Sequence, residues 1–315
     1  MHSSFLNPKN QTKLYIFKDV LTDFAKLYNK NQLPKKIILS GQKGIGKSTL
    51  AYHLINYIFS ENEKLKYDLD NCTINDQNKS FNFIQKNSHP NFHLIDVLDE
   101  KKNIEINQIR EMISYANKSS FNNSAKIILI DNIEKLNVNS VNALLKITEE
   151  TIEHLYFILI YDNTKKILDT LKSRFLKYNL SITNKQSLEI TNNILGKPIT
   201  DIINKDLINY YNSPGDYINL INFSNDLKLD LKQYNIHEFL NTIINNNYYK
   251  KNSFIKENIF RYIELYFNFL VYNSSSKKRI DFLYHEFIYK ISNLKKFNLD
   301  YESFFLEFKD NLLSE

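Results

Sequence analysis

The sequence predicts an α/β domain with a mainly parallel sheet, followed by two helical domains. Three observations predict it. Short apolar strands alternate with helical segments over residues 1 to about 180, a glycine-rich loop joins one strand to a helix, and the rest of the chain has helical periodicity. We place the domains at 1–180, 181–232 and 233–315, since 315 residues are too many for one ordinary core.

The first domain contains four clear strands. Each is a short apolar run, and they cover residues 37–39, 93–97, 127–130 and 156–160. Runs without polar alternation are typical of strands buried on both faces, as in a parallel sheet. The aromatic residues of 233–315 recur at helical spacing on apolar faces, so we interpret them as core and not as a surface on which bases stack.

The loop after the first strand matches the sequence motif of a phosphate-binding P-loop, Gly41-Gln42-Lys43-Gly44-Ile45-Gly46-Lys47-Ser48-Thr49. Strand, loop and helix (residues 50–59) follow in the order that the motif requires. The backbone N–H groups of Gly41, Gly44, Ile45 and Gly46 are expected to face phosphate oxygens at the positive end of the helix.

The side chains that end the loop predict a site for ATP or ADP with Mg²⁺. Lys47 is expected to reach the β and γ phosphates, Ser48 to ligate Mg²⁺, and Thr49 to bond near the α phosphate. The run 126–130 ends in Asp131, which resembles a Walker B strand. Asp131 is therefore predicted to be the second Mg²⁺ residue, at the carboxyl end of its strand.

Hydrolysis of ATP needs a carboxylate to polarise the attacking water, and the residue after Asp131 is Asn132. An amide orients water but accepts no proton at neutral pH, so a rate factor of roughly 10² or more is expected to be missing. Glu134 is expected to face another direction.

Several further segments occur around these elements: 33–34 before the P-loop strand, 89–94, 106–110, 137–150 with its Asn-Ala-Leu-Leu-Lys and Glu-Glu, and 171–175. With them, most of the first 220 residues resemble the δ′ family of clamp-loader subunits of bacterial DNA polymerase III, within the AAA+ class. The resemblance implies an AAA+ P-loop domain, a small helical lid and an all-helical collar that holds subunits in a ring.

The resemblance also implies a role for Arg174. Ser173-Arg174-Phe175 is similar to the family's Ser-Arg-Cys motif, whose arginine reaches the γ phosphate held by a neighbouring subunit; Phe175 departs from it. The chain uses Lys for nearly all positive charge, and a planar arginine suits a phosphate better. A surface arginine in a loop remains the alternative.

Two further departures from the family concern residues 212–216 and 60–88. Asp216 stands where hydrolysing members carry a sensor arginine, and a carboxylate there would repel a triphosphate. The segment 60–88 often holds a four-cysteine zinc module in the family, but Cys72 is the only cysteine, so no zinc is expected and the polar stretch reads as a surface excursion. The sequence assigns no function to residues 161–163.

The composition bears on the location of the protein and on the charge of its partners. The start of the chain lacks the pattern of a signal peptide, and no apolar run is long enough to cross a membrane, so the cytoplasm is expected. A net charge of +6 is spread along the chain and only weakly suggests an anionic partner.

The resemblance predicts a largely non-hydrolysing stator within the DNA polymerase III holoenzyme. Its partners would be the γ/τ and δ subunits of a hetero-pentameric ring, and through the ring a sliding clamp and primed DNA. Its own ATPase activity is expected to be weak or absent. The alternative is a hydrolysing motor subunit of the γ/τ type, and a metabolic kinase is a more distant one because no second substrate site is evident.

Overall fold

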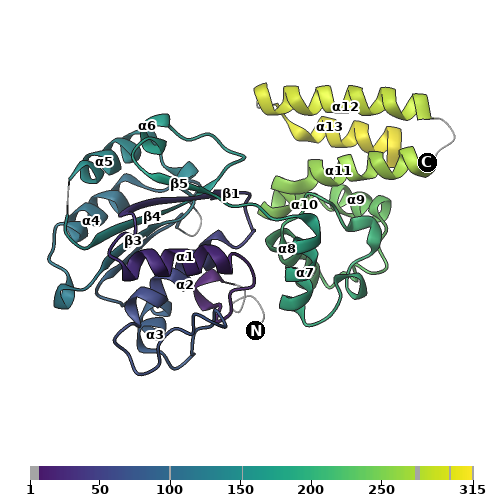
Figure 1. The fold of residues 1–315 in the computed structure, drawn as a ribbon. Coiled ribbons are helices and arrows are strands. Elements are labelled where there is room, and N and C mark those ends of the chain that lie inside the picture. The colour runs from purple at the N-terminus through teal and green to yellow at the C-terminus, as the bar shows by residue number, and fades with distance from the viewer. Residues whose placement is uncertain (1–6, 99–100, 151, 274–276, 298, 314–315) are drawn as a thin grey trace. The chain divides into compact units, whose positions relative to one another are not determined.

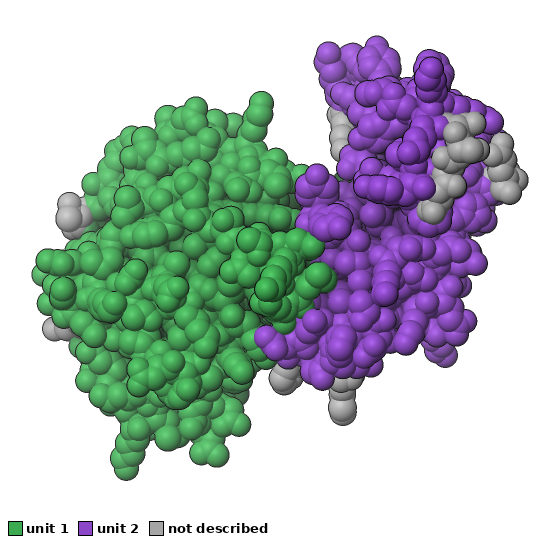
Figure 2. Space-filling view, turned by 45° about the vertical axis from the view of Figure 1, so that its right-hand side comes forward, with its two compact units in different colours: residues 1–190, 213–215 green, residues 191–212, 216–315 purple. Residues whose placement is uncertain are grey.

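The computed structural model describes residues 7–98, 101–150, 152–273, 277–297 and 299–313 (Figure 1). These fall into two compact units. Unit 1 comprises residues 1–190 and 213–215, and unit 2 comprises 191–212 and 216–315 (Figure 2). The separation of the helical part into domains at 181–232 and 233–315 stays a prediction.

Unit 1 is built on a five-stranded sheet in which every neighbouring pair is parallel, in the order β2-β3-β4-β1-β5. The strands are β1 (Lys36–Gly41), β2 (Phe92–Ile95), β3 (Lys126–Ile130), β4 (Leu155–Asp162) and β5 (Leu176–Asn179). The predicted α/β class with a mainly parallel sheet is therefore confirmed, and the four predicted strands are present. β5 was not predicted, because its residues are largely exposed and form no apolar run.

Helices cover both faces of this sheet (Figure 1). One face carries α1 (Lys18–Asn29), α2 (Lys47–Phe59) and α3 (Lys79–Gln85), and the other carries α4 (Ile106–Ala116), α5 (Val138–Glu149) and α6 (Asp169–Lys172). Strand side chains alternate between the two cores: Leu129 packs with the first group, while Ile128 and Ile130 pack with the second. Burial on both faces explains why these strands are continuously apolar.

The segment 60–88 differs from the expected surface excursion. Tyr67, Cys72 and Ile74 are buried in the same core as α2 and α3. Polar groups in this layer pair with one another, as where the Asn56 side chain donates to the Asn78 side chain at 3.0 Å. A few apolar residues spaced among many polar ones are enough to anchor this segment. No cluster of three or more His, Cys, Asp or Glu residues that could hold a metal ion occurs in the described ranges.

His53 makes the stability of this layer depend on pH. The ring is fully buried on α2, its Nδ1 lies 2.7 Å from the Tyr67 hydroxyl, and burial lowers its pKa from 6.5 to about 4. The unfolded chain therefore binds a proton between these values that the folded chain does not. The free energy of unfolding is expected to fall as the pH drops from about 6.5 to about 4, by at most about 3 kcal/mol from this residue.

Denaturant titrations at a series of pH values test this expectation. His53→Gln should reduce the dependence, and part of it should remain because burial also lowers the pKa of His89 to about 4. His154→Asn, at an exposed histidine with left-handed backbone that asparagine tolerates, is the control. A slope unchanged by His53→Gln would exclude His53 as its origin.

Two strands begin with a lysine that caps a helix. Lys126, the first residue of β3, is buried, and its Nζ donates to the carbonyls of Tyr115 at 2.5 Å and Lys118 at 2.6 Å, at the end of α4. Lys36, the first residue of β1, donates in the same way to the carbonyl of Thr148 near the end of α5. Positive charge at a helix C-terminus is favourable, so each lysine fixes a helix end to the sheet.

Unit 2 is helical in the described residues, as predicted for the C-terminal part. α7 (Asn184–Leu195) begins in unit 1, and the remaining elements are η5 (Ile199–Asp201), η6 (Lys205–Leu207), α8 (Pro214–Leu227), α9 (Ile236–Asn245), α10 (Tyr248–Lys251), α11 (Ser253–Asn273), α12 (Lys277–Phe297), α13 (Tyr301–Phe308) and η7 (Lys309–Leu313). None of the described helices has the length and apolar character needed to span a bilayer.

Many aromatic residues of unit 2 form a core, as predicted, whereas Tyr272, Phe282, Tyr289 and Phe297 are exposed. α11, α12 and α13 lie side by side (Figure 1) and meet through rings that are at most 4% exposed. The ring centroid of Phe287 lies 5.9 Å from that of Phe267, 5.5 Å from Phe304 and 5.4 Å from Phe308. These separations are typical of edge-to-face and tilted packing, so these four buried rings present no open face to a base.

Candidate functional site

The P-loop lies between the carboxyl end of β1 and the first turn of α2. Gly44 and Gly46 adopt left-handed backbone, with φ of 82° and 99°, and Gly46 is the N-cap of α2. Side chains rarely tolerate this conformation, which explains the glycines. The strand, loop and helix therefore occur as predicted, with the loop's N–H groups at the positive end of a 13-residue helix.

Two later segments of the chain border the loop closely. A Cβ added to Gly41 would lie 2.3 Å from the Leu180 carbonyl oxygen, and one added to Gly44 would lie 2.3 Å from the Ser213 hydroxyl. Gly215 donates its N–H to the Gly44 carbonyl at 3.0 Å. The segment 213–215, which belongs to unit 1, is thus part of the wall of the loop.

Lys47 is 5% exposed and folds back on its own loop. Its Nζ donates to the carbonyls of Gly41 at 2.8 Å and Gln42 at 2.6 Å. Burial lowers the pKa of Lys47, and the carboxylates of Asp131, Asp162 and Glu134 oppose this effect. The ammonium group is therefore held at the carboxyl edge of the sheet, between carbonyls and carboxylates.

Ser48 and Asp131, the two residues predicted to hold Mg²⁺, meet directly, while the Mg²⁺ site itself stays a prediction. The Ser48 hydroxyl donates to Asp131 Oδ2 at 2.6 Å. Burial and the nearby Asp96 raise the pKa of Asp131 to about 6, while the bonds from Ser48 and from the Asn132 N–H lower it. A hydroxyl and a buried carboxylate on adjacent elements are oxygen donors that suit a hard cation.

Asn132 is bound to a carboxylate from the neighbouring strand. Its backbone is left-handed, with φ of 56°, and its side-chain Nδ2 donates to Asp96 Oδ1 at 2.7 Å. Asp96 directly follows β2, which is two residues shorter than the predicted strand 93–97 at this end. Because the strand ends at Ile95, Asp96 lies at the same sheet edge as Asp131, and residues at strand ends are the signal that could have found it.

Glu134 also differs from expectation. It was expected to face away from the phosphate site, yet its Oε2 accepts the N–H of Asp162 at 3.2 Å, and Asp162 pairs with Gly41 in the sheet register. Burial raises the pKa of Glu134. The short turn η4 (Ile133–Lys135) directs this side chain back toward the sheet, where a regular helix start would have directed it elsewhere.

Residues 161–163, which include Asp162, the partner of Glu134, also have defined contacts. Tyr161 is buried in the core, and the Asp162 side chain accepts the N–H and hydroxyl of Thr164 at 3.1 and 2.9 Å. Asn163 donates its N–H to the Gly41 carbonyl at 3.3 Å. The segment 161–163 therefore supports the start of the P-loop through the end of β4.

Asp216 has a cationic partner within unit 2. Its Oδ2 lies 3.3 Å from Nη1 of Arg261 on α11. This pair gives the carboxylate a local structural function that the sequence analysis did not anticipate, because the two residues lie on different helices.

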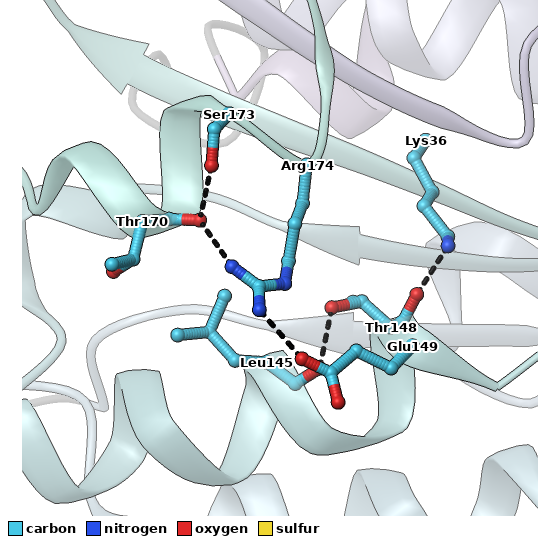
Figure 3. A network of polar contacts seen from close by, with 7 residues as sticks. All are labelled: Lys36, Leu145, Thr148, Glu149, Thr170, Ser173 and Arg174. Carbon is cyan, nitrogen blue, oxygen red and sulfur yellow. Dashed lines mark hydrogen bonds and ion pairs between the residues drawn. The ribbon is translucent and has the colours of Figure 1, made fainter.

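Arg174 forms a second site on unit 1, next to the end of α5 (Figure 3). Its Nη2 lies 2.6 Å from Glu149 Oε1, and its Nη1 donates to the Thr170 carbonyl at 3.1 Å. The Arg174 side chain is 36% exposed. Within the described part of the chain, these partners come from α5 and α6 and none comes from the P-loop, so the structure does not join Arg174 to the nucleotide-type site.

The residues around Arg174 fix its backbone. Ser173 is the C-cap of α6, and its hydroxyl donates to the Thr170 carbonyl at 3.1 Å. Phe175 is buried, with its ring centroid 6.5 Å from that of Phe157 on β4. The departure from cysteine at 175 therefore places a large apolar side chain in the core beneath the arginine.

Comparison with solved structures finds similar chains at low sequence identity. A DNA polymerase III gamma subunit-related protein from Thermotoga maritima aligns over 93% of this chain and 97% of that chain, with 16% identity and a TM-score of 0.48. The RuvB Holliday junction branch migration motor from the same organism aligns over 76% and 80%, with 16% identity and a TM-score of 0.42.

Comparison with curated sequences finds subunits of DNA polymerase III. Subunits delta′ from Buchnera aphidicola subsp. Schizaphis graminum and subsp. Baizongia pistaciae are 28% and 31% identical over 165 and 157 residues, which are 52% and 48% of this chain and 48% and 45% of those proteins. A subunit gamma from the first of these is 26% identical over 151 residues, 48% of this chain and 39% of that protein. The chain spans about half the length of the curated relatives it matches.

A family model described as DNA polymerase III, delta subunit, matches residues 16–184. This range contains the P-loop, Asp131 and Arg174, and it covers more than half of the chain. The chain therefore belongs to this family of DNA polymerase III subunits and is a delta′-like clamp-loader subunit.

Proposed function

We propose that this chain is a largely non-hydrolysing stator of a DNA polymerase III clamp loader, acting in the cytoplasm. It would bind γ/τ-type and δ-type subunits in a hetero-pentameric ring and present Arg174 to the nucleotide of a neighbour. Through the ring it would help to place a sliding clamp on primed DNA. The observation that carries this proposal is the partly exposed Arg174 guanidinium, which stands apart from the chain's own P-loop.

The P-loop would hold ATP or ADP. The N–H groups of residues 41–46, with Thr49, would surround the phosphates, and Lys47 would exchange its loop carbonyls for phosphate oxygens. Ser48 and Asp131 would hold Mg²⁺, because their oxygens already lie 2.6 Å apart on adjacent elements. A bound dication would also favour the charged form of Asp131.

Weak hydrolysis is proposed because position 132 provides no proton acceptor. The Asn132 amide is already bonded to Asp96, and a neutral amide cannot take the proton of an attacking water. By the resemblance to the family, Asp216 also takes the sequence position of the sensor arginine, so this chain would lack that cation, and its carboxylate is paired with Arg261.

The alternative is a hydrolysing motor of the γ/τ type. It is favoured by the complete P-loop and the Ser48–Asp131 pair, and by three carboxylates at the same sheet edge, Asp96, Glu134 and Asp162. The two functions differ in turnover by the isolated chain.

The deciding experiment measures nucleotide binding and phosphate release by the purified chain with Mg²⁺, alone and in the assembled loader. Binding without steady release is expected for the isolated chain. Steady release that Lys47→Ala abolishes would contradict the stator and favour the motor.

Asn132→Glu is expected to raise turnover by the isolated chain about tenfold. A complete general base contributes roughly 10²–10⁴, but glutamate at position 132 would lose the amide bond to Asp96, would be repelled by that carboxylate, and fits the left-handed backbone less well than asparagine. Asn132→Asp is the matched variant: it adds the same charge on a shorter side chain and should gain less. If turnover is already brisk and Asn132→Glu leaves it unchanged, the missing base is not what limits this chain.

A further inference from the structure

The second site on unit 1 joins Arg174 to one carboxylate. Glu149 Oε1 lies 2.6 Å from Arg174 Nη2, and the Thr170 carbonyl holds Nη1 (Figure 3). A guanidinium has five N–H donors, and these two partners engage one on each terminal nitrogen. The side chain is thus tethered at two points while part of its fork faces solvent.

The place of Glu149 in α5 is locally unfavourable. It is the last residue of the helix, and Glu150 follows, so two negative charges stand at the end where the helix dipole is also negative. Lys36 offsets this by donating to the Thr148 carbonyl one residue earlier. A residue that breaks a local rule is expected where a function requires it. The negative end of α5 attracts cations: Lys36 binds a carbonyl near the helix end, and Arg174 pairs with the Glu149 carboxylate.

We propose that Glu149 is a positioning residue, the resting partner of Arg174, which holds the guanidinium against unit 1 until a phosphate bound to a neighbouring subunit displaces the carboxylate. This inference rests on the proposed function of Arg174. It adds that the arginine is held by one carboxylate in the free chain and released from it on assembly.

The energetics allow such an exchange. The Arg174 and Glu149 side chains are 36% and 60% exposed, and a pair this open is weak because water screens it. A triphosphate offers several charged oxygens in a site with less water, and an arginine fork binds phosphate at two points. The phosphate would also repel the Glu149 carboxylate, so the two acceptors compete for one guanidinium.

The pair can be observed in the isolated chain by NMR of the arginine Nε–H groups. The chain has only four arginines, Arg110, Arg174, Arg261 and Arg279, so the Arg174 signal can be assigned with Arg174→Ala. Glu149→Gln is expected to move this signal. Glu150→Gln, which removes the same charge from the same helix end, should leave it in place. An Arg174 signal that does not respond to Glu149→Gln would overturn the inference.

The second test is ATP hydrolysis by the complete loader with clamp and primed DNA, measured at limiting amounts of this chain. Glu149→Gln is expected to raise the rate by about two- to fivefold, the equilibrium effect of removing one exposed ion pair. Glu150→Gln should not raise it, and Glu149→Gln should have no effect in the Arg174→Ala background. A rate that Glu149→Gln leaves unchanged or lowers would contradict a resting partner.

The two proposals fail in different ways. If Arg174→Ala leaves the rate of the loader unchanged, the proposed role of Arg174 is wrong, whatever Glu149→Gln does. If Arg174→Ala slows the loader but Glu149→Gln matches the wild type, Arg174 keeps its role and only the inference about Glu149 is overturned.

Discussion

Arg174→Ala is expected to slow DNA-stimulated ATP hydrolysis by the assembled clamp loader by about 10³-fold, the lower range for loss of an arginine finger. The reason is that charge develops on the transferred phosphoryl group, and a guanidinium that has exchanged Glu149 for the neighbour's phosphate in the assembled loader would stabilise this charge. Fold and assembly should survive, because the Arg174–Glu149 pair is half-exposed and contributes at most about 1 kcal/mol to stability.

Two variants sharpen the measurement on Arg174. Arg174→Lys keeps the charge but loses the planar fork, so it should recover only part of the rate. Lys172→Ala removes a positive charge two residues away, where Lys172 pairs with Asp169 at 2.9 Å, and should leave the rate near wild type. Equal rates for the wild type and Arg174→Ala, in complexes of the same subunit composition, would exclude Arg174 as an arginine finger.

Lys47→Ala is expected to weaken binding of ATP and ADP by the isolated chain by about 10²-fold. A charged hydrogen bond to a phosphate contributes about 1.5–3 kcal/mol, and each 1.4 kcal/mol is a factor of ten in affinity. Lys47 is buried with its ammonium on the loop carbonyls, so little side-chain freedom is lost when phosphate replaces them. Titration with a fluorescent nucleotide in Mg²⁺ measures the effect.

Lys43→Ala is the matched control for this titration. Lys43 lies in the same loop and is exposed, so its removal changes the net charge equally and should weaken binding only a few-fold. If Lys47→Ala binds nucleotide as the wild type does, the P-loop is not the nucleotide site. The proposal that it holds ATP or ADP is then wrong, whatever the result for Arg174.

The sheet and the P-loop could be predicted because their signals are local. Strands buried on both faces are apolar throughout, and Gly44 and Gly46 are needed for a backbone that few residues adopt. The proximity of Ser48 and Asp131 could also be predicted from the sequence, since the carboxyl ends of parallel strands meet at one edge of a sheet.

What the sequence did not reveal depends on contacts between distant segments. β5 is exposed and polar, and it is defined by its pairing with β1. The segment 60–88 is mostly polar, and a few apolar anchors such as Tyr67 decide its burial. The partners of Asn132 and Arg174 come from Asp96 and Glu149, 36 and 25 residues away, and no periodicity encodes such pairs.

β1 gives the two sites a common mechanical support. Its first residue, Lys36, fixes the end of α5 from which Glu149 holds Arg174, and its last residue, Gly41, begins the P-loop. Six residues of parallel strand place these ends about 17 Å apart. β4 and β5 bind β1 on both sides, so it cannot slide without breaking their ladders. The P-loop and the helix end that holds Arg174 are therefore attached to opposite ends of one strand that its neighbours keep in place.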